Sequence, residues 1–167
     1  MTPTQTCPFC GLQSDVIQGP THRYLVSTPG CWKVYGDVLA REYEDFRFFR
    51  LHDLTVDAYA LQHPGEPSDQ TIRSAVIHLT SLYAYFEEGV PAAKLSRVKQ
   101  LAARFKSEFT WLDPPETLSG LNCATLLSCE DPGEYETRLI AWADFVYTRW
   151  QNHHTTAREL YRRLGGV

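Results

Sequence analysis

The sequence predicts an all-α protein: a helical bundle of about five helices preceded by an irregular N-terminal segment. Two observations predict this class. After residue 29, apolar residues recur at gaps of three and four, which is the spacing of one helix face. No stretch longer than a few residues alternates between apolar and polar side chains, as a half-buried strand would. We therefore expect a single domain over 1–167, in which residues 1–28 are irregular and residues 29–167 form the bundle.

The first two helices are expected at 30–44 and 46–62. Ser27 or Thr28 can cap the first helix, whose apolar positions have helical spacing. The second helix must end before Pro64, because a residue that precedes proline is disfavoured in the α region.

The middle of the chain predicts one long helix and one more basic, more exposed helix. The long helix begins at Ser68 or Asp69, carries an apolar stripe, and stops at Gly89. The next helix is expected over 91–107, with Pro91 in its first turn, and a short helix is expected near 121–128.

The last helix has the clearest start signal. Asp131 can cap it, Pro132 suits the first turn, and Glu134 follows the cap by three residues, as in a capping box. The apolar pattern predicts an unbroken helix past His154. The side chains expected to face the core are Trp142, Val146, Trp150 and His153.

Composition restricts the possible partners. A chain of 167 residues with 43% hydrophobic and 22% charged residues is long and apolar enough to bury a core. Its net charge of −4, without a basic run, argues against binding to nucleic acid. The chain contains no run of about 18 apolar residues, the length that a membrane-spanning helix needs, so no membrane span is expected. The N-terminus lacks the features of a signal peptide, so we expect a cytoplasmic protein.

The cysteines predict a structural zinc site. Cys7-x-x-Cys10 followed by Gly11 is a common half-site, in which a tight turn directs two thiolates at one ion. Cys31 falls in the first turn of a predicted helix, where the helix dipole favours a thiolate. A zinc ion would also hold a segment that has no core of its own. Free surface thiols are the simplest alternative.

A redox function is a third interpretation of the same motif. Cys-Pro-x-Cys resembles the motif of thioredoxin-like oxidoreductases, which place it between a strand and a helix. No strand is expected before Cys7 and no helix directly after Cys10, so this interpretation lacks its structural context. Cys123 and Cys129 are better explained as small buried side chains.

The fourth zinc ligand is expected to be a histidine: His22, His52 or His63. His52 and His63 are eleven residues apart, about three helical turns and about 16 Å along the axis. They project from one face but cannot bind the same ion, so at most one of them serves the cysteines.

A second metal site or pocket is possible inside the bundle. Bundles build such sites from facing side chains, and the candidates here are His78, His153, His154 and Asp57. If the histidines converge, they would support a metal-dependent hydrolase or thiol transferase that acts on a small-molecule ligand. If each ring instead has an ordinary partner, the protein is better described as a binding or regulatory module with structural zinc. For Asp57, an ordinary ion pair with Arg73 or Arg158 is the simpler expectation.

Five motifs resemble those of an uncharacterised bacterial domain-of-unknown-function family. They are Cys-Pro-x-Cys-Gly at 7–11, Gly-Pro-Thr-His-Arg-Tyr at 19–24, Pro-Gly-Cys-Trp at 29–32, His-x-Leu-Thr-Val-Asp-Ala-Tyr-Ala-Leu-Gln-His-Pro at 52–64 and Trp-x-x-His-His at 150–154. The resemblance implies a small, mostly helical cytosolic protein and supplies no activity.

A looser resemblance is to DinB-like helical bundles, in which histidines on neighbouring helices bind a divalent metal. Those proteins commonly carry His-x-x-x-His on a late helix, whereas this chain has adjacent His153 and His154. The likeness concerns the fold and implies no function.

Overall fold

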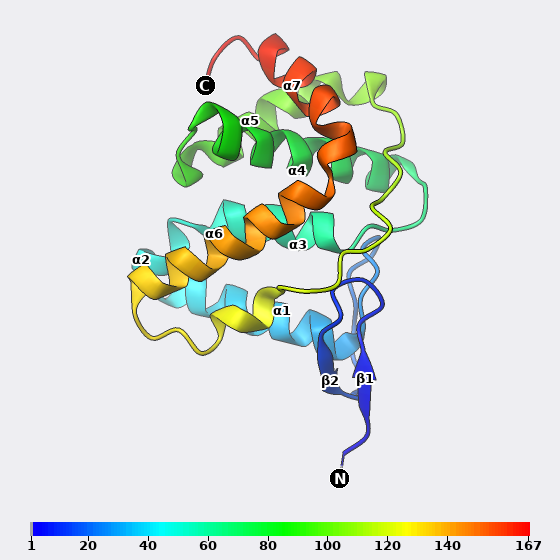
Figure 1. Ribbon diagram of the computed structural model, residues 1–167, viewed down its shortest axis with the longest axis vertical. Helices are drawn as coiled ribbons and strands as arrows, with labels where there is room; N and C mark the ends of the chain where they lie inside the picture. Colours follow the sequence, from blue (N-terminus) through cyan, green and yellow to red (C-terminus); the bar gives the residue numbers. More distant parts are fainter. Residues whose placement is uncertain (1) are drawn as a thin grey trace.

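Seven α-helices and one small sheet form within residues 2–167, the part of the chain that the computed structural model describes (Figure 1). The helices are α1 (Pro29–Glu44), α2 (Phe46–Phe49), α3 (His52–Gln62), α4 (Asp69–Glu88), α5 (Leu95–Ala102), α6 (Pro132–Arg149) and α7 (His154–Arg163). Four 3-10 helices join them: η1 (Ala92–Lys94), η2 (Ala103–Glu108), η3 (Cys123–Leu126) and η4 (Gln151–His153). The all-α class is therefore confirmed.

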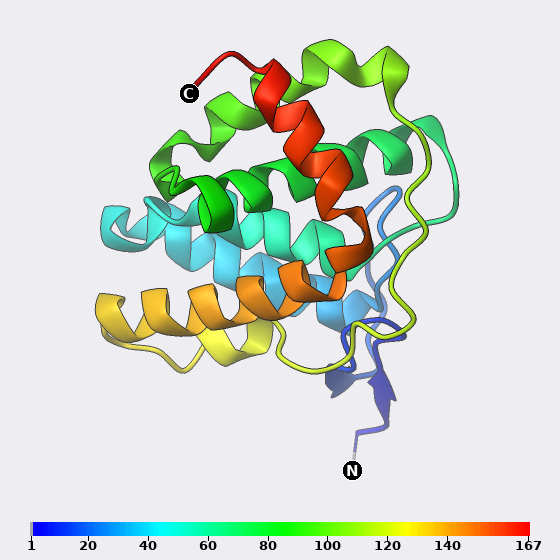
Figure 2. The ribbon, with the colours of Figure 1, turned by 45° about the horizontal axis from the view of Figure 1, so that its top comes forward.

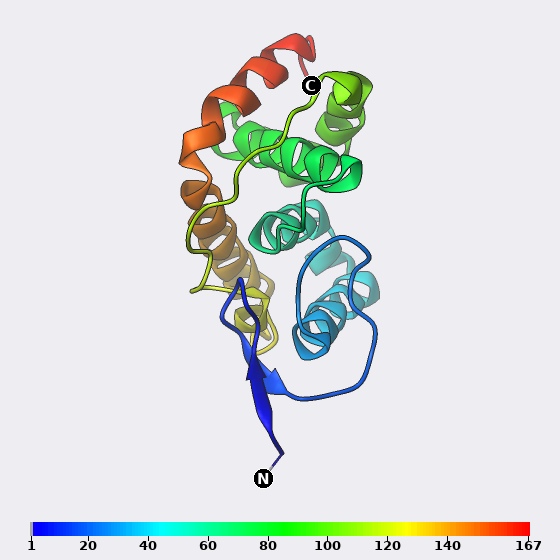
Figure 3. The ribbon, with the colours of Figure 1, turned by 90° about the vertical axis from the view of Figure 1, so that its right-hand side faces the viewer.

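Helix α3 occupies the centre of the bundle. It lies between α1 and α4, while α5 and α7 pack on α4 and α6 runs along the side of α3 and α4 (Figures 1 and 3). Most of the α3 side chains are buried, on all sides of the helix. Packing on all sides fixes the position of α3 and of both its ends. Its C-terminal end faces the N-terminal hairpin.

The N-terminal segment is less irregular than the sequence predicts. Strands β1 (Thr4–Thr6) and β2 (Gln13–Asp15) form an antiparallel hairpin, with Gln5 opposite Ser14. Strands of three residues are too short for an alternating pattern to reveal them. The hairpin and the C-terminus lie at opposite ends of the long axis (Figure 1).

Helix starts follow the local capping chemistry. The side chain of Thr28 accepts a hydrogen bond from the backbone N–H of Cys31, and that of Asp131 accepts one from Glu134. Ser68 and Thr71 form a reciprocal capping box at the start of α4. Gly89 ends α4 with φ 69°, in the left-handed region that favours glycine.

The helix expected over 46–62 is two helices. At the break, the N–H of Leu51 donates to Phe48 and the N–H of Leu54 donates to Leu51, which are hydrogen bonds of the tighter 3-10 kind. Phe48 and Leu51 are both buried. The tighter turn rotates the chain so that both side chains reach the core. The apolar spacing of a single continuous helix does not reveal such a turn.

The last helix is also interrupted, so the prediction of an unbroken helix past His154 was wrong. Helix α6 ends at Arg149, with Trp150 as its cap residue, η4 follows, and α7 leaves in a new direction to pack on α4 (Figure 2). The buried positions of Trp142, Val146 and Trp150 are confirmed. His153 was predicted to be buried, but it lies in η4 at the turn and is only partly buried.

The segments between α4 and α6 are shorter than predicted. The helix expected over 91–107 consists of η1, α5 and η2 in succession, and the one expected over 121–128 is the 3-10 helix η3. Helix α5 still buries an apolar face that includes Leu95 and Val98.

Candidate metal centre

Cys7 and Cys10 lie in the turn of the N-terminal hairpin. Cys7 follows β1 directly; its N–H donates to the carbonyl of Leu12 at 2.8 Å, and the N–H of Gly11 donates to the Cys7 carbonyl at 3.1 Å. Gly11 has φ 77°, and a Cβ there would lie 2.2 Å from the Ser119 hydroxyl oxygen. The turn therefore requires glycine at this position, both for its backbone conformation and for its packing.

This hairpin corrects one argument against a redox motif, because a strand does precede Cys7. The element after Cys10 is strand β2 and not a helix. The strand–motif–helix arrangement of thioredoxin-like proteins is therefore absent from this segment.

Cys31 comes from the first turn of α1. The Thr28 cap, at 3.1 Å from the Cys31 backbone nitrogen, fixes the start of that helix. The positive end of the helix dipole lies beside the Cys31 sulfur, which favours negative charge on it.

His63 follows the last residue of α3. Its Nδ1 lies 2.8 Å from the carbonyl oxygen of Tyr59, so this nitrogen carries the proton and donates it. The ring therefore directs an unprotonated Nε2 toward the cysteines, 3.4 Å from the Cys31 sulfur. A backbone carbonyl that orients the ring in this way is a common feature of metal-binding histidines.

Two tryptophans of the α6 segment hold the end of α3 in place. The indole N–H of Trp142 donates to the Gln62 side chain at 2.8 Å, and that of Trp150 donates to the Leu61 carbonyl at 3.0 Å. Both ring systems are buried. Packing of α6 against α3 thus fixes the position of the residue that follows α3, which is His63.

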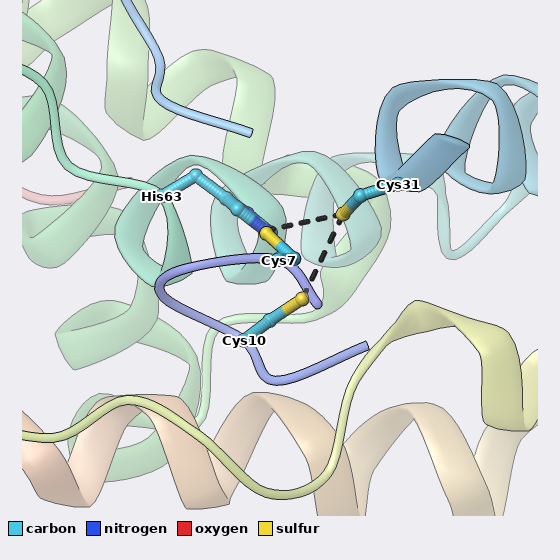
Figure 4. Close-up of side chains that lie close together, drawn as sticks. All are labelled: Cys7, Cys10, Cys31 and His63. Atoms are coloured by element: carbon cyan, nitrogen blue, oxygen red, sulfur yellow. Dashed lines mark hydrogen bonds between the residues drawn. The ribbon is translucent and has the colours of Figure 1, made fainter. Parts of the chain in front are cut away.

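The four side chains converge from three separate segments (Figure 4). Their ligand atoms all lie within 4.8 Å of one another, and the residues are 0–1% exposed. These are Cys7, Cys10, Cys31 and His63. The group could hold one metal ion that is closed off from solvent.

The spacing of the atoms fits a tetrahedral ion. Metal–sulfur bonds of about 2.3 Å and metal–nitrogen bonds of about 2.05 Å at tetrahedral angles place two sulfurs about 3.8 Å apart, and a sulfur and a nitrogen about 3.6 Å apart. The Cys10 and Cys31 sulfurs are 3.7 Å apart, and the Cys31 sulfur lies 3.4 Å from Nε2 of His63. Both distances are close to those of a coordinated group.

The pKa values of the three thiols shift in different directions. Hydrogen bonds from Cys10 and then Cys31 lower the pKa of Cys7, whereas hydrogen bonding to Cys31 and to Cys7, with burial, raises the pKa of Cys10. For Cys31, a hydrogen bond from Cys10 lowers the pKa, but its bond to Cys7 and its burial outweigh that effect and bring the pKa to about 12. All three can be thiolates together only if a bound cation balances their buried charge.

His22 and His52 lie outside this group. Nδ1 of His22 accepts hydrogen bonds from the N–H groups of Tyr24 and Leu25. Nδ1 of His52 lies 2.8 Å from the buried carboxylate of Glu42. The structure therefore selects His63 from the three histidines that the sequence leaves open.

The histidines of the expected second site do not meet at one point. Nε2 of His153 lies 2.9 Å from the Asp113 carbonyl oxygen, and Nε2 of His154 lies 2.9 Å from the Tyr147 carbonyl oxygen, beside the break between α6 and α7. Within residues 2–167, the only cluster of three or more His, Cys, Asp or Glu side chains that could hold an ion is the one around Cys7.

Asp57 and His78 instead form part of a buried ionic network. The fully buried Asp57 carboxylate accepts hydrogen bonds from His78 at 2.7 Å, Lys99 at 2.9 Å and the Ser81 hydroxyl. The ion pair expected at Asp57 is present, but its cation is Lys99, from the helix predicted to be more exposed, and not Arg73 or Arg158. No local sequence signal identifies Lys99, since its partner lies 42 residues away.

Because of this network, we expect part of the free energy of unfolding to depend on pH. Burial by itself would raise the pKa of Asp57, but the charge of Lys99, and then the hydrogen bond and charge of His78, lower it below the ordinary value of 3.8. Because the folded pKa is the lower one, this stability is present above pH 3.8 and is lost as the pH falls through the folded pKa.

Asp57→Asn is therefore expected to reduce the free energy of unfolding at neutral pH by about 1–3 kcal/mol, and the difference from wild type should shrink at about pH 2. Urea unfolding at both pH values measures this. Asp37→Asn, which removes an exposed carboxylate paired with Lys33, is the control and should change stability by less than about 1 kcal/mol. A gap for Asp57→Asn that is equal at both pH values would contradict the ionic explanation.

None of the helices in residues 2–167 combines the length and the apolar character needed to cross a lipid bilayer. No curated protein and no solved structure matches the chain. One family model matches it, over residues 5–151, and that match includes all four residues of the candidate metal centre. The chain therefore belongs to the family of unknown function DUF5946.

Proposed function

We propose that Cys7, Cys10, Cys31 and His63 bind one zinc ion, and that the protein is a binding or regulatory module whose zinc is structural. The observation that carries this proposal is the convergence of four buried ligand atoms within 4.8 Å. Three cysteines and one histidine are a frequent donor set of structural zinc. Soft thiolate ligands also favour zinc over magnesium or calcium.

The position of the group supports a structural role for the metal. The ligands come from the β1–β2 turn, the start of α1 and the end of α3, so one ion would tie the hairpin to two helices. Four protein ligands complete a tetrahedron and leave no open position for a substrate, which distinguishes structural from catalytic zinc. The reducing cytoplasm suits such a site, because its cysteines must stay unpaired to bind metal.

The alternative of a hydrolase or thiol transferase has weaker support. It needs histidines that share one ion with an open coordination position. His78, His153 and His154 each face a different partner, a carboxylate in the first case and backbone carbonyls in the other two.

Metal analysis of the purified protein tests the proposal. Mass spectrometry should count one zinc per chain in the wild type and close to none in Cys10→Ser, because serine is a poor zinc ligand. Cys129→Ser is the matched control: Cys129 is also buried, but its thiol donates to the Thr125 carbonyl away from the site, and the variant should keep its zinc. A wild-type protein without stoichiometric zinc, or a Cys10→Ser variant that retains it, would refute the proposal.

A further inference from the structure

A cavity of about 210 Å³ lies between α1, α3, α4 and residues 22–25, and none of the four metal-centre residues lines it. For comparison, a cavity of about 150 Å³ can hold benzene. A sphere of 210 Å³ is about 7 Å across, so groups on opposite walls can contact the same small ligand. The space therefore suits a single ring with a small substituent.

Aromatic side chains form one wall of this cavity. The rings of Tyr35 and Tyr59 stack at 3.8 Å, and Trp32 lies 5.4 Å from Tyr35 and 5.9 Å from Tyr59. Their mutual packing fixes the shape of this wall before any ligand arrives, and a planar group can lie against it.

His22 contributes a hydrogen-bond donor to the cavity. Its Nδ1 accepts from two backbone N–H groups, at 3.3 Å and 3.2 Å, so the proton of the neutral ring resides on Nε2. Burial, and next the nearby His78, lower the pKa of His22, which favours this neutral form. Every hydrogen bond that His22 makes within residues 2–167 uses Nδ1, so its Nε2–H can donate to a ligand.

His78 lines the same cavity from α4 and contributes a hydrogen-bond acceptor. Its Nδ1 lies 2.7 Å from the Asp57 carboxylate, which only accepts, so Nδ1 carries the proton of the neutral ring. Its Nε2 then presents a lone pair. Nε2 makes no hydrogen bond to any group in residues 2–167, and a ligand that carries an N–H can donate to it.

The two imidazoles therefore present opposite hydrogen-bonding groups and no net charge. No Asp, Glu, Lys or Arg side chain lines the cavity. A carboxylate would place an oxygen lone pair against the lone pair of His78, and a hydrocarbon would leave both imidazoles without partners. A neutral amide matches the cavity because it offers a carbonyl to His22 and an N–H to His78.

We propose that this cavity binds a small, neutral aromatic amide. The ring of the ligand lies against Trp32, Tyr35 and Tyr59. Its carbonyl accepts the Nε2–H of His22, and its N–H donates to Nε2 of His78. The proposal does not depend on the proposed zinc site.

Titration of the full-length protein with benzamide tests this assignment. Two-dimensional NMR should show saturable shifts of the Trp32 indole N–H, with a dissociation constant at or below about 1 mM, the range of a small fragment. Methyl benzoate keeps the ring and the carbonyl but has no N–H, and benzoate has a charged oxygen in its place. Each should bind at least about tenfold more weakly than benzamide. Equal or tighter binding of either compound, or no saturable binding of benzamide, would overturn the proposal.

Two variants act on different parts of the cavity. His78→Phe keeps a planar ring but removes the acceptor, so benzamide and methyl benzoate should then bind within about twofold of each other. Ser74→Leu fills space while both imidazoles remain, and it should weaken benzamide binding at least about tenfold. His153→Ala changes a histidine that does not line the cavity and should leave the affinity within about twofold.

A preserved preference for benzamide in His78→Phe, or an unaltered affinity in Ser74→Leu, would place the ligand elsewhere and refute the proposal. Because the comparison of the three compounds uses the wild-type chain, it decides the question even if one of the variants fails to fold.

Discussion

Removal of the proposed zinc ion by a chelator is expected to lower the thermal unfolding midpoint by about 8–16 °C. A ligand present at about 1,000 times its dissociation constant stabilises the folded state by about 4.1 kcal/mol, and each kcal/mol corresponds to about 2–4 °C for a chain of this size. The effect should concentrate in the hairpin, because strands of three residues cannot persist without further support. Scanning calorimetry with and without chelator measures the shift.

Hydrogen exchange locates the effect within the chain. Residues 4–15 should lose protection in the metal-free protein, whereas α6 should keep most of its protection, because its buried residues Trp142 and Val146 pack in the bundle core. Added zinc should restore the midpoint and added magnesium should not. An unchanged midpoint, with the hairpin equally protected, would mean that the metal has no structural role.

Trp150→Ala is expected to reduce the free energy of unfolding by about 3–5 kcal/mol. Trp150 is 1% exposed, and its indole N–H donates to the Leu61 carbonyl at the end of α3. The substitution therefore opens a cavity and removes a hydrogen bond at the place where α6 gives way to η4. Urea unfolding measures the loss.

Two further variants separate these contributions. Trp150→Phe keeps much of the apolar volume and leaves the Leu61 carbonyl without its donor, so its cost should be smaller, about 1–3 kcal/mol. Trp111→Ala removes a tryptophan that is only partly buried and should cost less than Trp150→Ala. Similar losses for Trp111→Ala and Trp150→Ala would show that burial of Trp150 is not the source of the effect.

The helix starts could be predicted from the sequence because they depend on neighbouring residues. Thr28, Ser68 and Asp131 cap the helices that begin after them, as their positions before the apolar pattern indicate. The breaks at Leu51 and Trp150 could not be predicted, because the apolar pattern continues through both. Packing against other helices decides where such a pattern is interrupted, and packing is not a local property.

In the candidate site, too, the local features could be predicted from the sequence and the tertiary contacts could not. The Cys7–Cys10 turn and Cys31 at a helix start are local features, and the sequence indicates them as ligands. The choice of His63 over His52, at opposite ends of α3, depends on which end faces the hairpin, and only the tertiary arrangement decides that. His78 was a candidate for a second metal site on sequence grounds, but its partner is the Asp57 carboxylate, which lies on another helix.

The order of the four metal-centre residues along the chain also sets an order for biosynthesis. Cys7 and Cys10 leave the ribosome first, and His63 follows 53 residues later, a delay of roughly 3–10 s at ordinary translation rates. A zinc ion captured early by the two cysteines would acquire its full set of ligands only when α1 and α3 have docked against the hairpin. If the proposed zinc binds, a nascent chain that fails to pack its first helices would hold the ion with an incomplete set of ligands and would lose it more readily, so zinc retention would report on correct assembly of the N-terminal half.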